Sequence, residues 1–203
     1  MKLYFSPNSP FVRKVHVLLH ELGRLEEVTL HDVTTTPMNF DSGLVATNPL
    51  GKIPALERAD GTTIYDSRVI TAYLNETFGG SLYPSGARGW ETRVLEATGD
   101  GIMECAVAMT YEVRLREPAQ QSEAWIEAQW TKASRAISAL NTRWMSHLHG
   151  PLDMGQIAVA CALCYLDFRH GARDWRSGHV ALADWHASFD SRASMQASGP
   201  GSG

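Results

Sequence analysis

The chain has 203 residues, 44% of them hydrophobic, which suffices for one globular domain or two small ones, each with a real core. A formal net charge of -4 argues against nucleic-acid binding through a basic surface, and no apolar run reaches the roughly 18 to 20 residues of a membrane span. The opening residues turn polar at Ser6, too early for a signal peptide, so we expect a cytoplasmic protein.

The first eighty residues alternate between strand and helix patterns. Residues 2–5 predict a short strand, and residues 11–22 carry apolar side chains at helical spacing up to Gly23. Residues 28–33 predict a second strand. Because a helix joins these two strands, we expect them to run parallel in one sheet with a right-handed crossover.

The next segment ends in a hairpin and another helix. Residues 34–47 are less regular and contain one short helix at most. Residues 53–57 and 63–65 then flank a turn around Gly61 and predict an antiparallel hairpin. Asp66 or Ser67 is placed to cap a following helix that ends near residue 79. The order β-α-β, link, β-β-α predicts a thioredoxin-like domain over residues 1–80.

After a linker around Pro84 the pattern becomes helical, which predicts an all-helical domain over residues 87–203. One long helix is expected from about residue 87 to residue 116. A second contains an apolar stripe between Ile126 and Trp144. Asp153 and Gln156 have the spacing of a capping box before an apolar helix. A short amphipathic helix follows around residues 182–189, and the small, polar residues 194–203 are expected to be disordered.

The three cysteines, Cys105, Cys161 and Cys164, are an odd number without secretory features, which argues against disulfides. Cys161 and Cys164 have redox spacing, but they lie in an apolar run that reads as a buried helix. We therefore interpret them as inert core thiols. No group of histidine, cysteine and acidic residues has metal-ligand spacing, so no metal is expected.

The first candidate site lies where the opening strand meets its helix. Pro10 suits a first helical position, which places Ser9 near the N-cap beside free amides and the positive end of the helix dipole. Ser9 either caps the helix only, or it also donates a hydrogen bond to a bound thiolate. A charge-assisted bond and a helix terminus together lower a thiol pKa by about one to three units. Ser6, nearer the strand end, is the less favoured alternative.

Two further segments add binding groups. In Ile53-Pro54, the proline opens a strand, and a cis bond there turns the Ile53 peptide groups outward to pair with an extended ligand. The alternative is an edge-strand proline that only ends the sheet. Asp66 and Ser67 either cap a helix or bind an ammonium and a carboxylate, respectively. Together the three segments suit a small, acidic, peptide-like ligand that carries a sulfur.

These segments, 9–15, 48–56 and 66–70, together with the late helix and the region around Trp185, resemble the cytosolic glutathione S-transferase family in its serine-type, bacterial-like branch. The resemblance covers nearly the whole chain. It implies glutathione as substrate, no metal, and a homodimer with a small hydrophobic electrophile bound between the two domains.

By the same resemblance, Ser9 stabilises the glutathione thiolate and Ile53, before Pro54, pairs with the cysteinyl residue. Asp66 and Ser67 hold the γ-glutamyl end, and Lys52 approaches the glycyl carboxylate. The electrophile contacts implied on the long helix are less specific, because a place in the helix core is the favoured role for each of them. These are Met103, Val107 and Tyr111.

Two departures from the family pattern narrow the expected chemistry. No cysteine stands at or near position 9, so disulfide reduction through a protein thiol is not expected. Gln156 stands where the family has an aspartate, but glutamine also completes a capping box. Arg13 matches a frequent family position, and a helix-surface ion pair explains it equally well.

We therefore predict conjugation of glutathione to small hydrophobic electrophiles. One alternative is a glutathione-dependent isomerase or dehalogenase of the same fold, although the family's isomerases carry a Ser-Ser-Cys stretch that Pro7-Asn8-Ser9 does not match. Another is a non-catalytic binding module of this fold.

Overall fold

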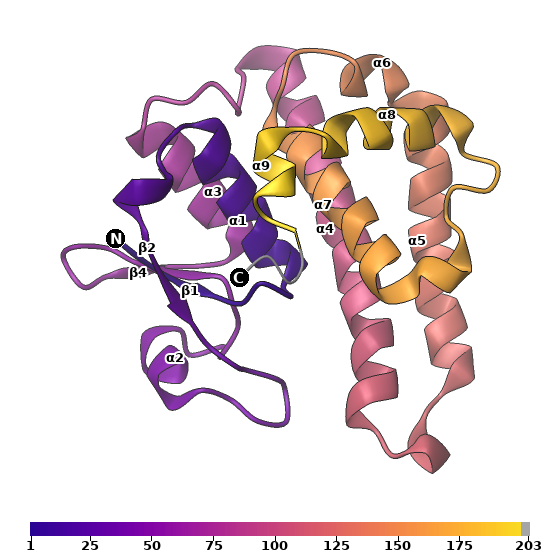
Figure 1. The fold of residues 1–203 in the computed structure, drawn as a ribbon, viewed down its shortest axis with the longest axis horizontal. Coiled ribbons are helices and arrows are strands. Elements are labelled where there is room, and N and C mark those ends of the chain that lie inside the picture. Colours follow the sequence, from indigo (N-terminus) through magenta and orange to yellow (C-terminus); the bar gives the residue numbers. More distant parts are fainter. Residues whose placement is uncertain (200–203) are drawn as a thin grey trace. The chain divides into compact units, whose positions relative to one another are not determined.

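A computed structural model describes residues 1–199 and divides the chain into two compact units (Figure 1). Of the described residues, the first unit contains Met1–Gly89 and 193–199, and the second contains Trp90–Arg192. No helix among the described residues combines the length and the apolar character that a membrane crossing needs.

The first unit contains a four-stranded sheet in the order β2-β1-β3-β4. Strand β1 (Lys2–Phe5) runs parallel to β2 (Thr29–Asp32) and antiparallel to β3 (Ala55–Glu57), and β3 pairs in a hairpin with β4 (Thr63–Ile64). This arrangement confirms the thioredoxin-like domain that the order of strand and helix patterns predicts.

Helices cover both faces of this sheet. Helices α1 (Pro10–Glu21) and α3 (Ser67–Thr77) pack against each other on one face, and α2 (Ser42–Thr47) lies on the other (Figure 1). Because side chains alternate along a strand, Leu3 and Tyr4 point to opposite faces. Tyr4 forms a buried cluster with Val33, Leu44 and Ala55, which anchors α2 to the sheet.

The second unit is helical, which confirms the second part of the fold class. It contains α4 (Gly86–Leu115, whose first residues belong to the first unit), α5 (Glu123–Arg143), α6 (Met145–Leu148), α7 (Met154–His170) and α8 (Val180–Asp190). Helix α7 is buried on every side from Met154 to Leu166. It packs closely against α4, because a Cβ at Gly99 would stand 2.7 Å from the Ala158 backbone.

The C-terminal segment corrects two expectations. Residues 194–199 are not disordered, since they include most of a short helix, α9 (Ala193–Gln196), that packs against α1; residues 200–203 lie outside the described part of the chain. Arg13 is buried, not a surface ion-pair residue, and it donates hydrogen bonds to the Met195 carbonyl (3.0 Å) and the Ser198 hydroxyl (3.3 Å). A buried guanidinium needs such acceptors, and the tail supplies them.

One acidic residue near the end of α4 makes the stability of the second unit depend on pH. Glu112 accepts the amide of Ser122 (2.9 Å) and the side chain of Arg116 (2.8 Å). The Ser122 amide, aided by Arg116, holds the pKa of Glu112 below its usual value of 4.5. The resulting stabilisation is present above the unfolded-state pKa and is lost as the pH falls through the lower folded-state pKa.

We therefore expect Glu112→Gln to reduce the acid sensitivity of unfolding in the range below about pH 4.5. Urea denaturation at a series of pH values measures this, with Glu117→Gln at an exposed neighbouring position as the control. Equal acid sensitivity of wild type and Glu112→Gln would contradict the assignment.

Candidate functional site

The register of the sheet brings the three predicted segments to one edge. Ser9 follows the carboxyl end of β1, Pro54 precedes the start of β3, and Asp66 follows the end of β4. Tyr4 near the end of β1 pairs with Ala55, and Leu56 pairs with Ile64 of β4. Since β1, β3 and β4 are neighbours, the three junctions spread across two strand spacings, roughly 10 Å. An extended tripeptide has the same length, about 10 Å.

Ser9 is the N-cap of α1. Its backbone is extended, and its Oγ accepts the amide of Val12 at 3.4 Å, with Pro10 in the first turn. A hydroxyl that accepts one bond still has its own proton to donate. Ser9 is half-buried at the positive end of a twelve-residue helix, so an anion placed there would meet both a donor and the dipole.

Ser6, Arg13 and His16 line a small cavity of about 20 Å³, which has room for one water molecule and no more. Burial, followed by the nearby charges of His20 and Arg13, lowers the pKa of His16. This lowering favours a neutral imidazole there. The sequence pattern did not reveal this neighbour of the Ser6 turn, because the two residues are brought together by the fold.

The proline loop is held in shape by a residue that sequence reasoning missed. Asn48 is buried, donates to the Lys52 carbonyl (2.8 Å) and accepts the Leu50 amide (3.0 Å). Gly51 has φ +60°, a conformation that favours glycine. The sequence does contain a signal for this role. An asparagine directly before a proline and three residues before a glycine is typical of a turn in which the asparagine side chain bonds to the backbone.

Ile53 and Pro54, which the sequence predicts to pair with an extended ligand, lie at the end of this loop. The Ile53–Pro54 bond is cis, as the sequence suggested. The Ile53 side chain packs against the cluster around Tyr4, and Lys52 is exposed. The loop therefore presents its backbone and one cation at the edge where Ser9 lies.

Asp66 and Ser67 begin α3. Asp66 is the exposed N-cap, and its carboxylate accepts the Arg68 amide (3.0 Å) and pairs with the Arg68 guanidinium (3.3 Å). Ser67 is only 3% exposed, so its hydroxyl is the less accessible of the two. The Tyr65–Asp66 peptide bond is also cis, which the sequence did not indicate.

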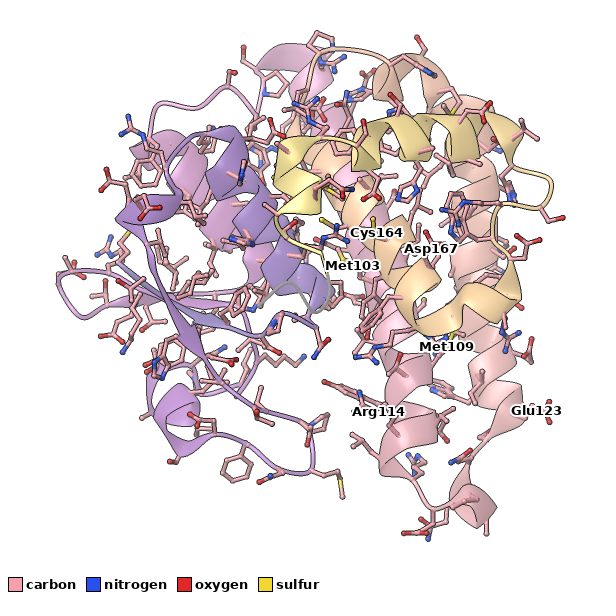
Figure 2. The ribbon with its side chains drawn as sticks, viewed as in Figure 1. Met103, Met109, Arg114, Glu123, Cys164 and Asp167 are labelled. Carbon is pink, nitrogen blue, oxygen red and sulfur yellow. The ribbon has the colours of Figure 1, made fainter. Side chains whose placement is uncertain are left out.

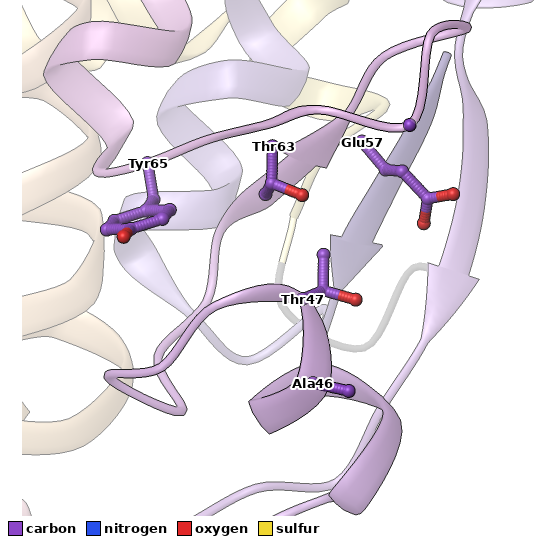
Figure 3. Close-up of a pocket in the computed structure, with 6 residues that line it drawn as sticks. Ala46, Thr47, Glu57, Thr63 and Tyr65 are labelled. Atoms are coloured by element: carbon purple, nitrogen blue, oxygen red, sulfur yellow. The ribbon is translucent and has the colours of Figure 1, made fainter.

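An open polar pocket of about 450 Å³ lies beside these junctions (Figure 3). Thr47, Glu57, Thr63 and Tyr65 line it with polar groups. It opens next to the hairpin and α2, and Tyr65 connects it to Asp66. None of the predicted ligand-binding residues lines this pocket, so it adjoins the Asp66 junction through Tyr65 and does not replace the predicted site.

The three residues expected to contact an electrophile all lie on α4, where Figure 2 labels Met103. Met103 is fully buried, as a core residue is, whereas Val107 and Tyr111 are half-buried. Burial, with a smaller contribution from Tyr165, raises the pKa of Tyr111, so this phenol keeps its proton and can donate it.

Two domain models of a known protein family match parts of this chain. Residues 8–77 match the glutathione S-transferase N-terminal domain, and residues 123–188 match the C-terminal domain. An uncharacterized GST-like protein of Escherichia coli, YibF, is 34% identical over 179 residues, which cover 86% of each chain.

Two solved structures are also similar. A glutathione transferase family member from Pseudomonas fluorescens Pf-5, with bound glutathione, is 42% identical with a TM-score of 0.96, and the match covers 98% of each chain. A glutathione S-transferase from Methylobacillus flagellatus, also with glutathione bound, is 33% identical with a TM-score of 0.84 over 98% of each chain.

Proposed function

Because this chain belongs to the glutathione S-transferase family, we propose that it binds glutathione and conjugates it to small hydrophobic electrophiles. The observation that carries the proposal is the meeting of three junctions at one sheet edge. This edge offers a hydroxyl at a helix terminus for a thiolate, a backbone to pair with a central residue, and a carboxylate for a terminal ammonium, which are the groups that this tripeptide requires.

The proposed pose assigns each end of glutathione to one junction. The Ile53 backbone pairs with the central residue, whose sulfur then faces Ser9 at the end of α1. Asp66 binds the γ-glutamyl ammonium and Ser67 its carboxylate. Lys52 lies on the loop side, where its charge favours the glycyl carboxylate.

In the proposed mechanism the first step is loss of the thiol proton. Ser9 donates its hydrogen bond to the resulting thiolate, and the dipole of α1 stabilises the same charge. The thiolate then attacks the electrophile and expels its leaving group, or adds to a double bond. Val107 and Tyr111 are the proposed electrophile contacts, whereas its full burial makes Met103 a core residue.

The relatives support conjugation in particular. A second structure of the Pseudomonas fluorescens family member contains S-(propanoic acid)-glutathione, at 41% identity to this chain and a TM-score of 0.91. That ligand is glutathione with a carbon substituent on sulfur, which is the bond that conjugation forms. We extend the proposal to a cytoplasmic detoxifying role.

Product analysis tests the proposed reaction. The purified protein is incubated with glutathione and a chloronitrobenzene-type substrate, and the glutathione that is consumed is compared with the thioether that is formed. Equal amounts of the two, above the uncatalysed rate, support conjugation. An isomerase returns glutathione unchanged, and a binding module shows uptake by calorimetry without turnover. No uptake of glutathione at all would end the proposal.

We expect Asp66→Asn to weaken glutathione binding without unfolding the protein. Asparagine caps a helix as well as aspartate does, so α3 keeps its N-cap while the carboxylate charge is lost. A charge-assisted hydrogen bond contributes roughly 1.5–3 kcal/mol, so Kd should rise about 10- to 150-fold. Calorimetry measures this, with Asp60→Asn in the hairpin turn as a control for net charge. Unchanged Kd would remove Asp66 from the site.

We also propose a homodimer. In the first unit Met38 is 77% exposed and Phe40 64%, and large apolar side chains at such exposure often mark a protein contact. We expect light scattering to give twice the chain mass, and Phe40→Glu to shift the equilibrium toward monomer. A wild-type monomer at micromolar concentration would contradict this.

A further inference from the structure

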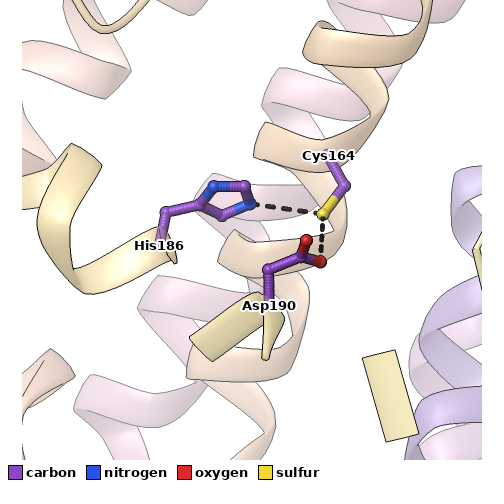
Figure 4. A group of neighbouring side chains, drawn as sticks. All are labelled: Cys164, His186 and Asp190. Carbon is purple, nitrogen blue, oxygen red and sulfur yellow. Dashed lines mark hydrogen bonds between the residues drawn. The ribbon is translucent and has the colours of Figure 1, made fainter. Parts of the chain in front are cut away.

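In the second unit, a thiol, an imidazole and a carboxylate converge between α7 and α8 (Figure 4). The Cys164 sulfur lies 3.2 Å from His186 Nε2 and 3.2 Å from Asp190 Oδ1. All three ligand atoms lie within 4.8 Å of one another. The proposed glutathione site uses none of these residues.

The two helices place these groups by simple periodicity. His186 and Asp190 are four residues apart, so they share one face of α8, and that face packs against α7 where Cys164 lies. Cys164 and His186 are buried, and Asp190 is half-buried at the end of α8. Asp190 is thus the side from which solvent and an ion would enter.

The ligand set fits a metal better than it fits a reactive cysteine. Zinc bonds of about 2.3 Å to sulfur and about 2.0–2.2 Å to nitrogen or oxygen give tetrahedral edges of roughly 3.5–3.7 Å at the sulfur. The two observed separations from the sulfur are 3.2 Å each, so both widen by a few tenths of an ångström on binding. A carboxylate beside the sulfur opposes a free thiolate, which argues against a nucleophile. A divalent ion reverses that effect, since a dication, a thiolate and a carboxylate sum to zero charge.

The hydrogen bonds without an ion are also satisfied, and they define what binding must change. The Cys164 thiol donates to Asp190, and Arg176 Nη2 lies 3.4 Å from His186 Nδ1. The Arg176 guanidinium is already paired with Asp167 and lies 4.4 Å from the Trp175 ring centroid, so its charge is compensated. On metal binding Cys164 releases one proton, the imidazole proton moves to Nδ1 so that Nε2 faces the ion, and Arg176 Nη2, which can only donate, turns away from Nδ1.

We propose that Cys164, His186 and Asp190 bind a divalent ion of the zinc class between α7 and α8, with a fourth position open to water. A mixed sulfur, nitrogen and oxygen set of three ligands with one open position is characteristic of zinc. The spacing gave no sign of this site, because Cys164 and His186 are 22 residues apart and are brought together only by helix packing.

The test uses the whole reduced chain, freed of metal with a chelator, and cobalt(II) as a spectroscopic probe of the zinc site. We expect a sulfur-to-cobalt charge-transfer band that saturates at one ion per chain and disappears when zinc is added. Cys164→Ser should lose the band. Cys161→Ser, on the same helix, and Cys105→Ser should keep it, which makes them matched controls.

Two further measurements keep the result independent of folding. Circular dichroism establishes that each variant is folded. Asp190→Asn, at the half-buried end of α8, should keep the fold and weaken cobalt binding at least tenfold. Zinc should also raise the melting temperature of the wild type and not that of Cys164→Ser. No charge-transfer band in the folded, reduced wild type, or an undiminished band in folded Cys164→Ser, would overturn the proposal.

Discussion

Ser9→Ala should lower the rate of conjugation roughly 10- to 30-fold at neutral pH, while glutathione Kd changes little. The lower limit is the rate equivalent of a charge-assisted hydrogen bond of about 1.5 kcal/mol, and the upper limit is set by the roughly 3% of a free thiol, pKa about 8.5, that is ionised at pH 7. Binding is nearly unchanged because the other contacts of the tripeptide come from the proline loop and the start of α3. Initial rates with a chloronitrobenzene-type substrate, together with calorimetry, measure the two quantities separately.

The pH profile distinguishes loss of the thiolate from loss of structure. A free thiol has a pKa of about 8.5, so the variant's rate should keep rising to that pH, whereas the wild-type rate should level off one or more units lower. A misfolded variant would show a uniform loss at every pH. Ser6→Ala is the matched control, since Ser6 lies in the same turn and its carbonyl, not its side chain, accepts the Ser9 amide at 3.1 Å. A larger loss in Ser6→Ala than in Ser9→Ala would transfer the role to Ser6.

Local patterns in the sequence predicted most of the first unit. The strand and helix periods around β1, α1 and the β3–β4 hairpin depend on neighbouring residues, and the N-caps Ser9 and Asp66 are set by short motifs. The meeting of the three candidate segments is also predictable from the fold class, because sheet order and strand direction determine which strand-end junctions share an edge.

Long-range contacts explain what the sequence did not predict. Residues 194–199 are small and polar, but buried Met195 and the bonds from Arg13 order them, and no local pattern reports a partner some 180 residues away. Cys164 behaves differently from Cys161 for the same reason. Cys161 is fully buried as predicted, whereas the face of α7 that carries Cys164 meets two polar side chains of α8.

The capping motif before α7 was predicted in part, and the structure adds to it. Asp153 is the N-cap and accepts the Gln156 amide at 3.2 Å. The Gln156 side chain donates to the carbonyls of His147, Gly150 and Pro151, so it braces the preceding loop. Glutamine is suited to this because its amide nitrogen is a donor, which a carboxylate lacks.

Asp153 also joins α7 to two other elements of the second unit. Its Oδ2 lies 2.7 Å from His147 Nε2 and accepts the Thr92 hydroxyl at 3.0 Å. Asp153 is 1% exposed, so water cannot replace these bonds. His147 in turn contacts Glu91 at 3.2 Å, which gives the network a second contact with α4 beside Thr92.

We therefore expect Asp153→Ala to lower the free energy of unfolding by about 2.5–8 kcal/mol. Loss of a helix cap costs about 0.5–2 kcal/mol, and each buried donor left without a partner adds about 1–3. Asp153→Asn should cost less than Asp153→Ala, because asparagine keeps the cap but presents an amide nitrogen or a neutral oxygen to His147 and Thr92. Urea denaturation of the whole chain measures both variants.

Ser122→Ala is the matched control, since Ser122 caps α5 through a single exposed bond to the Trp125 amide at 3.2 Å. Ser122→Ala should lower the free energy of unfolding only by the contribution of a helix cap, about 0.5–2 kcal/mol. The difference between Asp153→Ala and Ser122→Ala then isolates the buried network from the cap. If the two alanine variants cost the same, His147 and Thr92 are satisfied by other partners once the carboxylate is gone, and α7 is held in place by its apolar packing alone.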